Sequence, residues 1–249
     1  HPAILSVLRL SAGPLALTSA NRTGEADSLT AHQVMHSLGD KLALILDDGQ
    51  CKFAQPSCVV QVQGNRWELL RSGVLNESTL KRLASYIVLF VCTGNTCRSP
   101  MAAALMQRQL AERLGISADQ LEESGLLVMS AGIAAMAGGC ASHDAVRVMS
   151  EQGLDVSRHE SQPLSDRLVR FADVIYTMTR GHREAILAQW PGAAPRTFVL
   201  GDAQGDVSDP IGGTAEVYRR CAEQIEGFLK LRIEELDLTS VLAAGGLGG

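Results

Sequence analysis

The second part of the sequence alternates between short apolar runs and amphipathic helical stretches. This alternation predicts an α/β fold, in which a parallel sheet with right-handed crossovers carries helices on both faces. The strand-like runs occupy 87–91, 126–132, 171–179 and 196–200, and the helical stretches 99–115, 142–153, 180–190 and 213–236. Ligands of such sheets bind at the carboxyl ends of the strands. The loops that follow the apolar runs are therefore the first places to look for chemistry.

The loop after the first of these runs carries the strongest candidate site. It reads Cys92-Thr93-Gly94-Asn95-Thr96-Cys97-Arg98-Ser99, and we expect Ser99 to cap the next helix, with Pro100 at its first position. Backbone N–H groups and a helix N-terminus directed at one point form a binding site for a phosphate-like dianion. The same field favours a thiolate at Cys92, which would make it a nucleophile. Arg98 would hold two phosphoryl oxygens.

A disulfide scaffold, a zinc site and a nucleotide-binding loop all fit this segment less well. The six cysteines are too few for a disulfide scaffold of this length, and no Cys-x2-Cys pair suggests zinc. No Gly-Lys-Ser/Thr follows, which excludes a Walker-type nucleotide loop, and a single glycine excludes a dinucleotide fingerprint. A buried, inert cysteine is the common role for a residue that ends a strand. The spacing to Arg98 makes a functional role for Cys92 the better interpretation.

The segments "VCTGNTCRSPMA" and "DVSDPIGG" (206–213) together resemble the low-molecular-weight protein tyrosine phosphatases over residues 87–236. The resemblance implies that Cys92 attacks phosphorus, that Arg98 binds the phosphoryl group, and that Asp209, which precedes Pro210, is the general acid. It also implies a covalent phosphocysteine, with no metal and no cofactor. Two easy displacements would thus replace one difficult hydrolysis.

The resemblance extends to the rest of the loop. It implies that Asn95 and Ser99, with Ser130, brace the loop by hydrogen bonds, and that Cys97 can trap Cys92 as a reversible disulfide under oxidation. Each of these side chains could instead be an ordinary turn, cap or core residue. The implied substrate-binding residues are Thr93, Gly94, Asn95, Thr96, Cys97 and Ser99.

Two positions bear on the substrate. Tyrosine-directed members carry a bulky aliphatic residue where Thr96 stands and aromatic residues after the Asp-Pro pair, where this sequence reads Ile211-Gly212-Gly213. Both positions are instead similar to bacterial protein-arginine phosphatases, and a threonine leaves room and a hydroxyl for a phosphoguanidinium group. We favour phosphoarginine. Phosphotyrosine stays open, as does arsenate reduction, for which Cys140 is a loose redox candidate.

Other polar residues are less promising. His143, His159 and His182 are solitary, and we do not expect them to be catalytic. Arg158 stands in a region where relatives often place histidine, which leaves the bracing of the loop open. We interpret Asp173 as a strand-entry residue.

The first part of the sequence resembles the carboxyl-terminal part of the YrdC/Sua5 family, which makes threonylcarbamoyl-adenylate for tRNA modification. Four strands at 14–25, 42–50, 57–65 and 66–73, with a helix near 30–39, predict a partial mixed α/β segment. The resemblance rests on Ser19, Asn21 and Arg71 as remnants of the nucleotide site, although Cys58 departs from the usual small hydroxyl residue. The family's basic nucleotide-binding motif is absent, so we expect no ATP turnover and an incomplete sheet with exposed edges.

We therefore expect a fusion protein seen in part, with domains at 1–85 and 86–240 and a flexible tail at 241–249. The predicted partner is a phosphorylated protein, with tRNA bound only through a complete amino-terminal domain. A net charge of -5 argues against nucleic-acid binding by charge alone. No apolar run is long enough for a bilayer, so we predict no membrane partner and a cytoplasmic protein.

Overall fold

The computed structural model describes residues 1–17, 19–64 and 66–238. These residues form two compact units. The first comprises His1–Gln61 and Leu69–Asn76, and the second comprises Val62–Glu68 and the chain from Glu77 onward. The expected tail at 241–249 lies outside the described residues.

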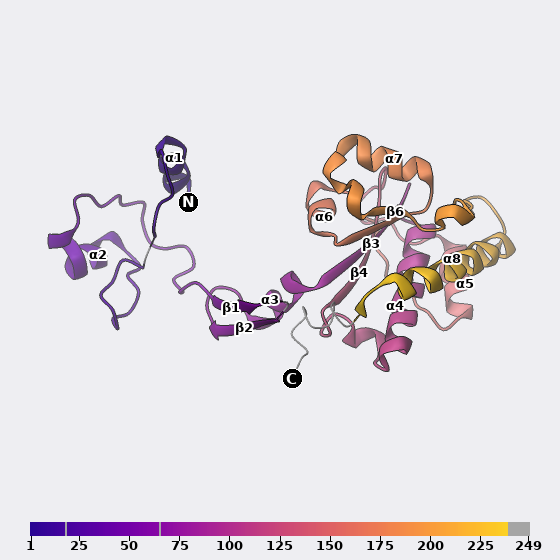
Figure 1. The fold of residues 1–249 in the computed structure, drawn as a ribbon, viewed down its shortest axis with the longest axis horizontal. Coiled ribbons are helices and arrows are strands. Elements are labelled where there is room, and N and C mark those ends of the chain that lie inside the picture. The colour runs from indigo at the N-terminus through magenta and orange to yellow at the C-terminus, as the bar shows by residue number, and fades with distance from the viewer. Residues whose placement is uncertain (18, 65, 239–249) are drawn as a thin grey trace. The chain divides into compact units, whose positions relative to one another are not determined.

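The second unit is built on a four-stranded parallel sheet (Figure 1). Its strands are β3 (Tyr86–Cys92), β4 (Leu126–Gly132), β5 (Val174–Thr177) and β6 (Thr197–Val199), in the order β4-β3-β5-β6. The register pairs Cys92 with Gly132 and Val91 with Thr177. Three strands therefore end at the same edge, where the predicted loop begins.

Helices cover both faces of this sheet, as predicted (Figure 1). Side chains of β3 alternate between the two cores: Val88 and Phe90 pack in the larger one, whereas Leu89 and Val91 pack in the smaller one. All four are fully buried, and each contributes roughly 1.5–3 kcal/mol relative to an exposed position. The helices of the larger core are α4 (Arg98–Leu114), α5 (His143–Glu151) and α8 (Ala215–Glu235), and those of the smaller core are α6 (Asp166–Phe171) and α7 (Arg180–Gln189).

Two details of this unit differ from expectation. Helix α4 begins at Arg98 with Cys97 at its N-cap, so the prediction that Ser99 caps the helix was wrong. The carbonyl of Cys97 already accepts the first helical bond, from the N–H of Met101, which places Ser99 in the first turn with its hydroxyl facing the loop. Helix α6 was not predicted, and Ser165 caps it. Short 3-10 turns occur at Ala118–Gln120, Pro191–Arg196 and Asp202–Gln204.

The first unit contains less regular structure than its sequence predicts. It holds α1 (Pro2–Leu10), which was not expected, α2 (Ala31–Leu38), which was, and a 3-10 turn at Gly39–Lys41. Residues 59–63 and 66–71 form a two-stranded sheet of β1 (Val59–Gln63) and β2 (Arg66–Arg71), and α3 (Glu77–Ala84), which belongs to the second unit, follows.

The strands predicted at 14–25 and 42–50 are absent from the described residues there. No described residue between 1 and 76 is buried. Strands need both paired neighbours and a covered face, and these two segments have neither.

Candidate active site

The predicted loop runs from the end of β3 into α4 and lies against the end of β4. The N–H groups of Ile133 and Ala134 bind the carbonyls of Cys92 and Thr93, each at 3.0 Å. Gly132 is required here, because a Cβ at this position would lie 2.5 Å from the Thr93 carbonyl oxygen and 2.9 Å from the Asn95 nitrogen. The loop therefore packs on backbone where any side chain would displace it.

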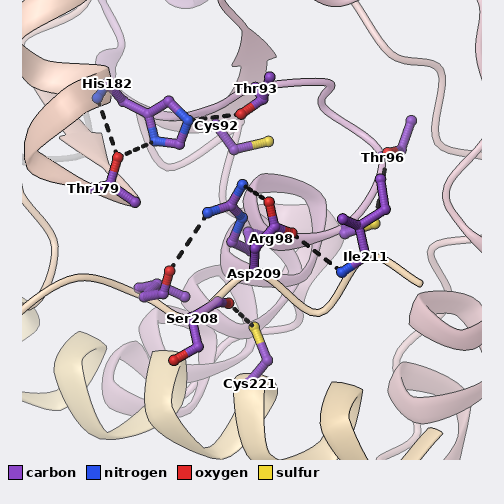
Figure 2. A network of polar contacts seen from close by, with 12 residues as sticks. Cys92, Thr93, Thr96, Arg98, Thr179, His182, Ser208, Asp209, Ile211 and Cys221 are labelled. Carbon is purple, nitrogen blue, oxygen red and sulfur yellow. Dashed lines mark hydrogen bonds and ion pairs between the residues drawn. The ribbon is translucent and has the colours of Figure 1, made fainter. Parts of the chain in front are cut away.

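The sulfur of Cys92 lies at the floor of this loop, with 3% of the residue exposed. The N–H of Asn95 donates to Sγ over 3.2 Å, and the Ser99 hydroxyl lies 2.9 Å from the same atom. Both neighbours can donate a hydrogen bond, which suits a sulfur anion. Figure 2 shows Cys92 above the Arg98 guanidinium and beside Thr93.

The buried side chain of Asn95 makes three hydrogen bonds around the loop. Its Nδ2 donates to the hydroxyls of Ser99 and Ser130, both at 2.9 Å, and its Oδ1 accepts from the N–H of Gln162 at 2.9 Å. The residue is fully buried with a φ of 56°, a left-handed conformation that asparagine tolerates better than most residues. One side chain thus ties α4, β4 and the segment after α5 together.

His159 also contacts the loop. Its Nε2 lies 2.7 Å from the Asn95 carbonyl oxygen. Arg158 stands where relatives often have a histidine, and this left the bracing of the loop open. In the structure the next residue, His159, contacts the loop. A histidine beside the expected position was the available signal. Gln162 gave none.

Arg98 and Asp209 face each other across the loop opening (Figure 2). The Arg98 guanidinium is buried, and its Nη2 forms an ion pair with Asp209 Oδ2 at 2.5 Å. The Asp209 side chain is 45% exposed, and its Oδ1 accepts from the N–H of Ile211. The structure therefore brings Cys92, Arg98 and Asp209 to one site, with the carboxylate at its open side.

Hydrogen bonds to Met178 and Gln224 hold the segment that carries Asp209. The N–H of Val207 binds the Met178 carbonyl at 2.8 Å, and Gln224 binds both the Ser208 N–H and the Asp206 carbonyl. The Asp206 carboxylate accepts a hydrogen bond from the N–H of Arg180 in the first turn of α7. Its role is therefore structural, and it does not serve the opening of the site.

Two cysteines besides Cys92, Cys97 and Cys221, lie near the site. Cys97 Sγ lies 3.3 Å from the Ser142 hydroxyl and 3.4 Å from that of Tyr218. Burial and the contact with Cys97 raise the pKa of Tyr218 to about 12. Cys221 donates to the Ser208 carbonyl, and burial raises the pKa of its thiol to about 12. Cys140 is exposed.

The remaining loop residues lie at the rim. Thr93 is exposed, whereas Gly94 and Thr96 are half-buried. The Thr93 hydroxyl lies 2.9 Å from His182 Nε2, a contact that was not anticipated from the sequence. Burial, reinforced by the Arg98 charge, lowers the pKa of His182 below its usual value.

The other candidates fall elsewhere. Asp173 accepts from the N–H of Ile87 at 2.7 Å and so joins the starts of β3 and β5, in agreement with its interpretation as a strand-entry residue. His143 lies at the surface. Within the described residues, no group of three or more His, Cys, Asp or Glu side chains could hold a metal ion. None of the described helices is long and apolar enough to cross a bilayer.

The three residues expected to be remnants of a nucleotide site lie in separate surroundings within the first unit. Ser19 lines an open hollow of about 590 Å³. The Asn21 amide donates to the Glu25 carbonyl, and the Arg71 guanidinium donates to the Ser57 carbonyl. Neither Asn21 nor Arg71 lines that hollow.

A parallel α/β domain with a cysteine on the floor of a loop that directs a backbone N–H at its sulfur, and with an arginine and a carboxylate at the opening, defines a cysteine-dependent phosphatase. Residues 87–240 match the family model described as low molecular weight phosphotyrosine protein phosphatase. The chain belongs to this family, and it is a protein phosphatase.

Individual relatives agree. The chain is 37% identical to a protein-arginine-phosphatase of Geobacillus stearothermophilus over 61% of this chain and 96% of the relative. A low molecular weight protein tyrosine phosphatase structure from T. tengcongensis has a TM-score of 0.55 at 36% identity, over 61% of this chain and 100% of its own. A second structure is of an arginine phosphatase mutant with a phosphorylated active site serine; its TM-score is 0.53, at 34% identity over 60% of this chain and 95% of its own.

The first unit has a separate relationship. Residues 1–73 match the Sua5/YciO/YrdC family model, described as telomere recombination. This match supports the predicted fusion of a YrdC-like segment with a phosphatase.

Proposed function

We propose that this phosphatase hydrolyses phosphoarginine in proteins, with Cys92, Arg98 and Asp209 as its catalytic residues. In the first step the Cys92 sulfur attacks phosphorus and the phosphorus–nitrogen bond breaks. As the general acid, Asp209 gives a proton to the departing guanidine nitrogen. Arg98 holds the phosphoryl oxygens and offsets the charge that grows on them.

The second step returns the enzyme to its starting state. The Asp209 carboxylate takes a proton from a water molecule, and the water oxygen attacks the phosphorus of phosphocysteine. The sulfur–phosphorus bond breaks, which releases inorganic phosphate and restores the Cys92 thiolate. The exposed position of Asp209 supports this double role, because both the leaving group and the water arrive from the open side.

The nature of the loop rim carries the substrate assignment. Thr96 presents a hydroxyl at a half-buried position, and the residue after Pro210 is Ile211, which is 72% exposed. No aromatic residue stands directly after the Asp-Pro pair to stack on a phenol ring. A planar guanidinium needs a hydrogen-bond acceptor and space. The Thr96 hydroxyl can accept, and the small threonine side chain leaves that space. Two of the relatives are arginine phosphatases, which agrees with this assignment.

The test compares wild type, Thr96→Ile and Thr96→Ser on a phosphoarginine peptide and an aryl phosphate. We expect wild type to prefer phosphoarginine, Thr96→Ile to reverse or abolish that preference, and Thr96→Ser to keep it. A wild type that strongly prefers the aryl ester, or a preference that Thr96→Ile leaves unchanged, would contradict the assignment.

The covalent route has its own test. Cys92→Ser should lose turnover and still bind inorganic phosphate, because the amides and Arg98 remain in place. Activity that survives in this variant would exclude a phosphocysteine intermediate.

Partners and location complete the proposal. The substrate is a phosphorylated protein. Binding of tRNA through a complete amino-terminal domain and a cytoplasmic location stay predictions, as does the absence of ATP turnover by residues 1–85.

A further inference from the structure

We propose that His182 is a positioning residue that fixes the Thr93 hydroxyl as a hydrogen-bond donor to a phosphoryl oxygen of the substrate. This inference rests on the proposed function, since it assigns a role within the same pocket. It adds a second polar element to the rim, supplied from α7 rather than from the loop itself.

The imidazole of His182 lies between two hydroxyl groups (Figure 2). Its Nδ1 is 2.9 Å from Thr179 Oγ1, and its Nε2 is 2.9 Å from Thr93 Oγ1. The residue is 6% exposed, whereas Thr93 is exposed at the loop rim. A buried ring thus links the N-cap of α7 to the residue directly after the nucleophile.

The hydrogen bonds of Thr179 are compatible with a proton on Nε2 of the ring. As the N-cap of α7, Thr179 Oγ1 accepts from the His182 N–H at 3.2 Å. Its own hydroxyl proton can then go to Nδ1, and we assign Nδ1 the acceptor role; the second lone pair of Oγ1 would serve the other tautomer. A neutral imidazole that accepts at Nδ1 carries its proton on Nε2. His182 therefore donates to Thr93.

The surroundings favour the neutral ring that this arrangement needs. Burial and the Arg98 guanidinium lower the pKa of His182, while Asp209 and Asp206 oppose them without outweighing them. A neutral ring keeps an acceptor at Nδ1, which a protonated ring would lack.

The hydrogen bond from His182 also sets the direction in which the Thr93 hydroxyl can donate. Its oxygen already accepts from His182, so its own proton is free to point away from the ring, toward the pocket. Figure 2 shows Thr93 beside Cys92, where a bound phosphoryl group would present oxygens. The orientation of the Thr93 hydroxyl is fixed before the substrate binds. The hydroxyl can therefore stabilise the charge that develops on the phosphoryl oxygens without being ordered during the reaction.

A double-mutant cycle tests this role through kcat/KM on both a phosphoarginine peptide and an aryl phosphate. Thr93→Val removes the hydroxyl and keeps the shape. His182→Asn keeps an amide near Nδ1 but cannot reach Thr93, whereas His182→Gln places an amide N–H near the position of Nε2. We expect about a fivefold loss for Thr93→Val and for His182→Asn, the value of one neutral hydrogen bond. The double variant should lose no more than either single one, and His182→Gln should regain most of the activity.

Three results would overturn the proposal: losses that multiply in the double variant, equal activity of the His182→Asn and His182→Gln variants, or a loss confined to phosphoarginine. If His182→Asn does not fold, as judged by its unfolding midpoint, Thr93→Val in the wild-type and His182→Gln backgrounds decides by the size and the substrate independence of its effect. The cycle can be read on the aryl phosphate alone. A wrong substrate assignment and a wrong role for His182 are therefore distinguishable.

Discussion

Replacement of Gly132 by alanine is the sharpest test of how the loop is positioned. The added Cβ would lie 2.5 Å from the Thr93 carbonyl oxygen, about 1 Å short of the ~3.5 Å at which non-bonded atoms pack comfortably. Two of the three nearest atoms are backbone atoms of the loop, the Thr93 carbonyl oxygen and the Asn95 nitrogen, and the third is the Cβ of Ala135, so the loop itself has to move. A displacement of about 1 Å at reacting groups costs on the order of 100-fold in rate. Overpacking of this kind costs roughly 1–3 kcal/mol of stability.

The measurement is kcat/KM on a phosphorylated substrate, together with the urea midpoint. Gly227→Ala is the matched control, because nothing lies within 4 Å of a Cβ there and the residue is inside α8. We expect the control to keep full activity and to gain up to about 1 kcal/mol from helix propensity. Activity of Gly132→Ala within about threefold of wild type would refute the view that backbone contact between β4 and the loop sets the site, since the expected loss is on the order of 100-fold.

Four further outcomes are expected. Asp209→Asn should lower kcat by about 100-fold or more on a substrate with a poor leaving group and less on one with a good leaving group, and an equal loss on both would contradict its role as acid. Asn95→Ala should lose roughly 2–4 kcal/mol in urea unfolding, since it leaves two hydroxyls and an N–H without their partner and puts alanine at a φ of 56°; a loss below about 1 kcal/mol, the value of a single hydrogen bond, would show that the network is replaceable. The lowered pKa of His182 means that the unfolded chain binds its proton more tightly, so the free energy of unfolding should fall as the pH drops below about 6.5, and His182→Gln should show a shallower fall; identical pH profiles would contradict this. With its pKa raised to about 12, the Cys221 thiol should resist alkylation in the folded protein at about pH 8 and react after denaturation, and equal labelling in both states would contradict its burial.

The phosphatase fold followed from sequence because its signals were local and mutually consistent. Buried strands such as β3 are continuous apolar runs, and each is followed by an amphipathic helix. The loop was also readable, since Cys92 and Arg98 are close in sequence. Asp209 lies 111 residues from Arg98, and only the resemblance connected the two before the structure placed them in contact.

What could not be predicted depended on distant partners. His182 and Gln162 act on the loop through hydrogen bonds across 89 and 67 residues, and neither lies in a motif that marks it. Helix α6 is too short for a clear period. In the first unit, apolar runs with high strand propensity failed to form strands because propensity alone does not supply a pairing partner.

The absence of buried residues among the described positions up to 76 bears on the lifetime of the protein. A protease cuts where the backbone can enter its cleft. A segment without buried residues needs no prior unfolding to do so. The phosphatase unit, with its two cores, opens far less often. The quantity of active enzyme and the quantity of intact two-part chain can therefore diverge during degradation, and the catalytic half should be the longer-lived product.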